Sequence, residues 1–118
     1  MNPALNVQIS DVLKQLGVPM HLKGHFYLKS SIAETLHDPK LMFSICELYS
    51  KVADEYDVDP MNVERNIRHA IKVAWSRGDR NAQLALFGHT VDTNKGKPTN
   101  SEFICAIVDW FNNKGVRT

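Results

Sequence analysis

The sequence contains little cysteine, and it has no apolar run long enough to cross a membrane. Its two cysteines, Cys46 and Cys105, lie far apart in apolar surroundings. Buried reduced thiols are therefore favoured over a disulfide or a metal site. The chain also does not begin with the charged and apolar regions of a signal peptide. These features together predict a cytoplasmic protein.

Residues that would support enzymatic chemistry are scarce as well. No glycine-rich loop suited to phosphates and no recognisable set of nucleophile, base and orienting residue occurs. His21 and His25 are four residues apart, but no third side chain has a clear claim to complete a metal site. We expect the two histidines to pack or form hydrogen bonds around the bend at Pro19. The sequence thus predicts neither an enzyme nor a cofactor or metal.

Net charge is nearly absent too, since 14 Lys and Arg oppose 13 Asp and Glu, leaving +1. A nucleic-acid-binding protein of this composition would have to concentrate its cations on one face. The 118 residues, 43% of them hydrophobic, are sufficient for one domain with its own core. Charge segregation within that domain is therefore the pattern to look for.

Helical periodicity of apolar residues accounts for most of the chain, and no strand-like alternation of useful length occurs. Residues 1–6 have no pattern and are predicted to be a tail or a linker remnant, before a domain spanning 7–118. Asp38-Pro39 and Asp59-Pro60 are typical helix starts, and Thr99-Asn100-Ser101-Glu102 is a capping-box pattern. The expected helices are 7–16, 22–36 with Phe26, Ile32 and Leu36 buried, 39–56, 60–77, a short one within 79–87, and one after Thr99. The prediction is an all-α compact bundle of about six helices.

The link between the third and fourth expected helices is short enough for a helix-turn-helix. Ala53 is small where the two helices would cross, Val58 is apolar in the turn, and Val63 would anchor the second helix. Asp57 replaces the usual turn glycine, and aspartate tolerates the left-handed conformation better than most residues. These spacings predict a helix-turn-helix whose second helix begins at Pro60.

One face of that second helix gathers the cations. Arg65 can donate two hydrogen bonds to a guanine, and Glu64 can accept one from a cytosine amino group. Cations further along the helix suit phosphates. The alternative interpretation of this face is that its charges are simply solvated. The loop that carries Lys95 and Lys97 also has two interpretations of equal weight. It is either a solvated turn or a phosphate site before a helix N-terminus. The face comprises Met61, Glu64, Arg65, Arg68, His69, Lys72 and Ser76, opposite an apolar stripe of Val63, Ile67, Ile71 and Trp75.

Four segments resemble the effector domain of the stage-zero sporulation response regulator, the master transcription factor of sporulation. They are Leu16 to Gly24, Val63 to Ile71, Val73 to Gly78 and Lys97 to Ile104, and the resemblance extends from about Val7 to Val108. It implies a six-helix, DNA-binding domain of a two-component system, acting as activator and repressor of transcription. It also implies a recognition helix that reads a box with a TCG core, often present in tandem copies.

The resemblance also assigns roles to individual residues. Glu64 and Arg65 match the base-reading pair, and Arg68 and His69 match DNA contacts on the helix face. Asn62 stands where the family has an arginine that contacts the DNA backbone, preceded by Met61 in place of serine. Leu86 and Phe87 match part of the region that touches the RNA polymerase sigma subunit.

Two further expectations concern the missing receiver domain and contacts between copies of this chain. The family's receiver domain would not fit in a chain of this length, so phosphorylation control would lie outside it. Copies on tandem boxes are expected to touch through the last helix, around Ile104 to Phe111, with Trp110 as an anchor.

The alternative function is a helical protein–protein interaction module that does not bind DNA. That module would need an exposed apolar stripe, whereas the exposed stripe found in the sequence is polar and basic.

Overall fold

The computed structural model describes residues 3–88 and 96–116, and its secondary structure is entirely helical over these ranges. In chain order the helices are α1 (Pro3–Leu16), α2 (Lys23–His37), the 3-10 helix η1 (Pro39–Phe43), α3 (Ile45–Tyr56), α4 (Pro60–Arg77), α5 (Arg80–Phe87) and α6 (Asn100–Val116). The predicted all-α bundle of about six helices is confirmed. None of the described helices is both long and apolar enough to cross a membrane.

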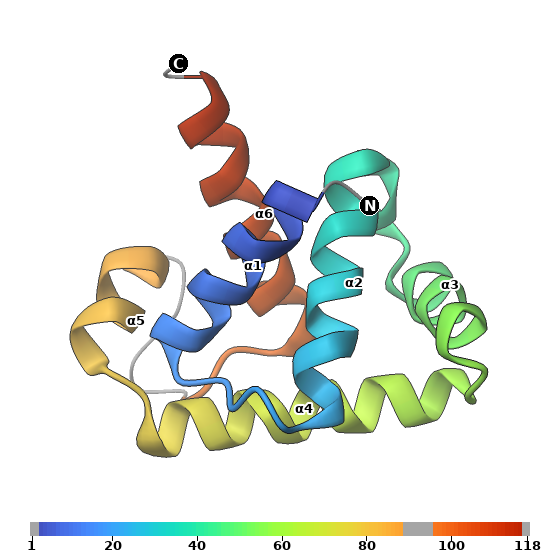
Figure 1. Ribbon diagram of the computed structural model, residues 1–118, viewed down its shortest axis with the longest axis horizontal. Helices are drawn as coiled ribbons and strands as arrows, with labels where there is room; N and C mark the ends of the chain where they lie inside the picture. The colour runs from blue at the N-terminus through green and yellow to red at the C-terminus, as the bar shows by residue number, and fades with distance from the viewer. Residues whose placement is uncertain (1–2, 89–95, 117–118) are drawn as a thin grey trace.

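Helix α2 occupies the centre of the molecule, and α4 runs along the bottom edge of the molecule in Figure 1, across the lower end of α2. α2 packs against α1, α3, α4 and α6, so it connects the two halves of the chain. The core between these helices is formed by aliphatic residues together with Tyr27, Phe87 and Phe103, all almost completely shielded from solvent. Its largest fully buried members are Phe103, Ile9, Leu13, Leu16, Leu28, Ile32, Leu41, Leu48, Ile67, Ile71, Ile104 and Ile107.

Local signals start the helices where the sequence predicted. The Asp59 carboxylate accepts a hydrogen bond from the backbone N–H of Met61 over 2.9 Å, and Pro60 fills the first position of α4. At α6 the predicted capping box is confirmed. Thr99 N–H donates to the Glu102 carboxylate over 2.8 Å, and Glu102 N–H donates to the Thr99 hydroxyl over 3.1 Å. These caps satisfy backbone donors that a helix start would otherwise leave unpaired.

The structure differs from the prediction at two helix boundaries. α1 already begins at Pro3, so the described part of the expected tail is helical. Proline suits a first turn because its missing N–H has no helical partner there. The segment expected as one helix from 39 to 56 is broken at Ser44, whose backbone is non-helical (φ −140°, ψ 69°). The break separates η1 from α3 and leaves Phe43 90% exposed, while Leu41 reaches the core.

Two expectations about burial were wrong. Phe26 is 42% exposed, because six residues separate it from Ile32 and the two therefore lie on different faces of α2. Its ring is instead 5.2 Å from the Lys29 ammonium nitrogen. Cys46 and Cys105 are free thiols, but Cys46 is exposed and Cys105 half-buried. Partial burial raises the pKa of the Cys105 thiol.

Candidate nucleic-acid interface

The turn between α3 and α4 has the backbone that the sequence predicted. Asp57 adopts the left-handed conformation (φ 55°, ψ 51°) and ends α3. The N–H of Val58 then donates to the Ala53 carbonyl over 3.0 Å, which closes the turn. Ala53 and Val63 are buried at the packed junction of the two helices. This short turn fixes where α4 begins relative to the rest of the domain.

The two faces of α4 differ sharply in exposure. Val63, Ile67, Ala70, Ile71 and Ala74 form its buried stripe. Trp75 continues this stripe but is only half-buried, so its expected burial is met in part. The exposed residues of the opposite face are Met61, Arg65, Arg68, His69, Lys72 and Ser76, which we call the outer strip. The outer strip therefore presents three permanent cations and a histidine to solvent.

Glu64 lies at the edge of the outer strip and is half-buried. Its carboxylate forms an ion pair with the Arg68 guanidinium one turn later. More than half of the Arg68 side chain is exposed, so the pair contributes little to stability. Its consequence is electrostatic, because Arg68 offsets a negative charge on a face that is otherwise cationic.

Asn62 does not belong to the outer strip, although the resemblance placed a DNA contact there. Its side-chain carbonyl accepts hydrogen bonds from the Tyr27 hydroxyl over 3.4 Å and from the Asn66 amide over 2.9 Å. Asn62 thus joins α4 to α2 instead of projecting from the exposed face. Both bonds use the side-chain oxygen of Asn62, so a contact with the DNA backbone through its amide N–H groups stays a prediction.

Two residues that the sequence analysis did not single out hold α4 against its neighbours. The Asn100 side-chain amide donates to the Glu64 backbone carbonyl over 3.1 Å and to the Tyr49 hydroxyl over 3.0 Å. Tyr49 belongs to α3, so the three residues join α3, α4 and α6 at one point. Burial raises the pKa of the Tyr49 hydroxyl above its ordinary value of 10.0. The capping-box pattern located Asn100 at the helix start, but nothing local indicated this cross-link.

A hollow of about 320 Å³ opens beside this cross-link. Tyr49, Glu64, Arg68, Lys97 and the first residues of α6 line it. The structure therefore brings Lys97 and Arg68, which are distant in sequence, to the same depression. Lys95 lies outside the described residues.

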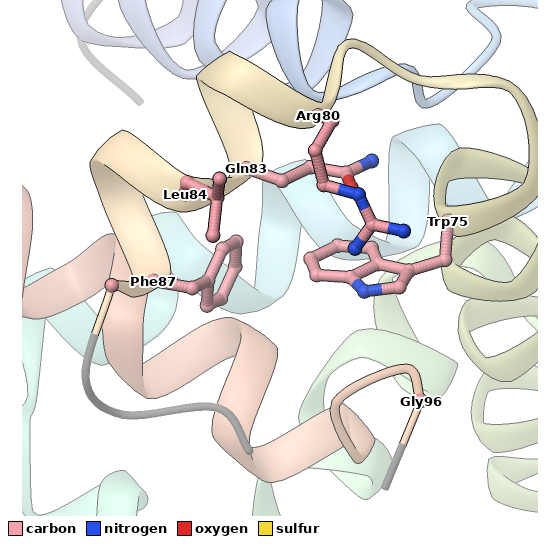
Figure 2. Close-up of a pocket in the computed structure, with 7 residues that line it drawn as sticks. Trp75, Arg80, Gln83, Leu84, Phe87 and Gly96 are labelled. Atoms are coloured by element: carbon pink, nitrogen blue, oxygen red, sulfur yellow. The ribbon is translucent and has the colours of Figure 1, made fainter. Parts of the chain in front are cut away.

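Helix α5 carries the two residues that the resemblance associated with polymerase. Phe87 is only 3% exposed, and its ring packs 5.1 Å from Trp75 and 5.4 Å from Phe103, between ring centroids. Figure 2 shows Trp75 and Phe87 beside a small pocket that Arg80 also lines. Phe87 is thus a core residue with almost no surface for a partner, whereas Leu86 is half-buried.

These features define the class of protein. It is an all-helical domain in which a short turn after α3 positions α4, and the outer strip of α4 is cationic. A family model described as Sporulation initiation factor Spo0A C terminal matches residues 9–111. The chain therefore belongs to this family. Its members are DNA-binding domains that regulate transcription in sporulation.

Proposed function

We propose that this domain reads a short DNA box with a TCG core by placing α4 in the major groove, and that it acts as both activator and repressor. The observation that carries the proposal is the outer strip of α4, in which Arg65 is exposed and has Arg68 and Lys72 beside it. A helix fits the major groove, where each base pair presents a distinct pattern of donors and acceptors.

Base reading falls to Glu64 and Arg65. The Arg65 guanidinium forms two parallel hydrogen bonds with guanine O6 and N7, and the Glu64 carboxylate accepts from a cytosine amino group. The ion pair with Arg68 supports this role for Glu64, because it offsets the repulsion between a carboxylate and the phosphates. Asn100 also donates a hydrogen bond to the backbone carbonyl of Glu64, which supports a fixed position for this residue on α4.

Phosphate contacts position the domain on the duplex. His69 and Lys72 extend along the exposed face of α4, and Lys97 flanks it in the loop before α6. Arg68 lies between these groups and lines the same hollow as Lys97. A phosphate beside this hollow would meet Arg68 of α4 and Lys97 of the loop before α6. Lys95 remains a proposed member of this set on the sequence pattern alone.

Base discrimination by Arg65 tests the proposal. Binding to a TCG box and to the same duplex with the core guanine exchanged would be compared by mobility shift. We expect Arg65→Ala to lose about 1–3 kcal/mol of discrimination at that base pair. Arg77→Ala is the matched control, since it removes the same charge from the exposed end of α4 outside the outer strip. If the wild-type domain binds both duplexes equally, the proposed function is wrong and a protein-interaction module becomes the better hypothesis.

We further propose that neighbouring copies on tandem boxes touch through α6. Trp110 and Phe111 are half-buried there, with ring centroids 5.0 Å apart in an edge-to-face arrangement. Partly exposed aromatic side chains are common anchors of interfaces. Cooperative binding to two correctly spaced boxes should weaken in Trp110→Ala. Cooperativity that survives this substitution in a folded variant would exclude Trp110 from the contact.

Contact with the RNA polymerase sigma subunit is the remaining proposal, and it concerns α5. Leu86 offers some surface, whereas the buried Phe87 would act by holding α5 in place. Leu86→Ala should therefore reduce transcription by the sigma-containing polymerase without changing affinity for the box. An unchanged level of transcription would remove Leu86 from this role.

A further inference from the structure

Met61 is the one large apolar side chain of the outer strip. It lies on the first turn of α4 and is 65% exposed. Its backbone N–H is held by the Asp59 carboxylate, so the position of its Cα is fixed at the start of the helix. Exposure of this degree means that the side chain contributes little to the core. Its apolar side chain is therefore available to a partner of the outer strip.

The spacing along α4 relates Met61 to the proposed base readers. It precedes Glu64 by three residues and Arg65 by four, so all three lie along one side of the helix. With a rise of about 1.5 Å per residue, Met61 lies roughly 6 Å from Arg65 along the axis. Base pairs repeat about every 3.4 Å, so Met61 would face base pairs one or two steps from the one under Arg65.

An apolar side chain has one natural partner in the major groove. Among the base edges exposed there, the C5-methyl group of thymine is the apolar one. Methionine suits such a contact because its side chain is flexible and its sulfur is polarizable. The neighbouring Asn62 accepts hydrogen bonds from Tyr27 and Asn66 through its side-chain oxygen, so this side chain is engaged with α2 and within α4.

We propose that Met61 is a specificity-determining residue that contacts the methyl group of a thymine next to the bases read by Glu64 and Arg65. This inference rests on the proposed function. It adds a sequence preference at a position where neither hydrogen-bonding residue can act. It also predicts that the preference depends on one methyl group and not on base pairing.

Replacing thymine by deoxyuridine tests this contact, because only the methyl group is removed. Each thymine of the bound box, on either strand, would be replaced singly, and the affinity measured by fluorescence anisotropy. Wild-type protein should lose about fourfold in affinity at one thymine, the fold-change expected for one buried methyl group. Met61→Ser should bind the two duplexes equally, and Met61→Leu should restore the difference.

Met20→Ser is the matched control, because Met20 is 53% exposed but lies outside α4. It should keep the full response to deoxyuridine. If Met61→Ser responds to deoxyuridine as the wild type does, or if no thymine responds in the wild type, Met61 does not read a methyl group. Either result leaves the proposed function standing as long as Arg65→Ala still loses discrimination. Failure of the wild type to prefer the box at all would instead refute the proposed function.

Discussion

The side-chain amide of Asn100 and the backbone carbonyl of Glu64 are joined by a hydrogen bond of 3.1 Å. This bond connects the start of α6 to the part of α4 that carries the proposed base readers. A side chain on α4 can read a base edge only if the helix itself is held at the right depth and rotation. Positioning groups of this kind are as necessary as the residues that touch the ligand.

Removal of the Asn100 amide should therefore affect specificity more than general DNA affinity. We expect Asn100→Ala to reduce discrimination between the TCG box and a changed box several-fold, while the salt-dependent affinity for unrelated DNA stays the same. Tyr49→Phe removes the Tyr49 hydroxyl and spares the bond to Glu64, so it should keep the discrimination. Competition binding at two salt concentrations measures both quantities. Equal losses on both kinds of DNA would show that Asn100 acts on phosphate contacts or on stability instead.

Close packing between α2 and α4 leads to a second prediction. A Cβ atom added at Gly24 would lie 2.6 Å from the Cβ of Ala70 and would also collide with the backbone carbonyl of Asn66. Gly24→Ala should thus force the helices apart and lower the free energy of unfolding by about 1–3 kcal/mol. Lys23→Ala, at the exposed neighbouring position, is the control for helix propensity. Urea denaturation measures the difference, and a stabilised Gly24→Ala variant would contradict the tight contact.

The aromatic cluster of Trp75, Phe87 and Phe103 gives a third prediction. Phe103 is fully buried, so Phe103→Ala should lower the free energy of unfolding by about 3–5 kcal/mol. Trp75 packs against both phenylalanines but is half-buried, and we expect Trp75→Ala to cost less, about 2–3 kcal/mol. Thermal or urea unfolding ranks the two variants. The reverse order would mean that Trp75, and not Phe103, is the centre of the cluster.

The parts of the fold that the sequence predicted depend on local chemistry. Asp59 and Pro60 start α4 through interactions within one turn, and Asp57 ends α3 through its own backbone preference. Helical periodicity then placed the outer strip of α4 correctly, because exposure follows from the buried stripe on the opposite side. The proposed base readers lie on or beside that strip.

The parts that were missed depend on contacts distant in sequence. The partners of Asn62 on α2, and those of Asn100 on α3 and α4, are set by how the helices pack. No spacing rule predicts such pairs. The break at Ser44 is of the same kind, because continuous helical periodicity across 39–56 hides a change of direction. Phe26 was misplaced for a simpler reason, since its spacing from Ile32 does not fit one helix face.

The last prediction concerns His25, which is buried against α1 with its Nε2 atom 3.0 Å from the Ser10 hydroxyl. Burial lowers the pKa of this imidazole below its ordinary value of 6.5, and the nearby Lys29 charge lowers it further, while the backbone of Val18 acts in the opposite direction. The folded protein therefore binds a proton at His25 less readily than the unfolded chain does.

Its contribution to stability must then be complete above pH 6.5 and must decrease as the pH falls from there toward the lower pKa of the folded state. The free energy of unfolding, measured by urea denaturation between about pH 7.5 and about pH 5.5, should fall with pH in the wild type. His25→Gln retains a hydrogen-bonding group for Ser10 but has no proton to gain, so its stability should vary less over this range. His37→Gln, at an exposed position, should behave as the wild type does. An identical pH dependence in His25→Gln and the wild type would show that other groups cause the loss of stability.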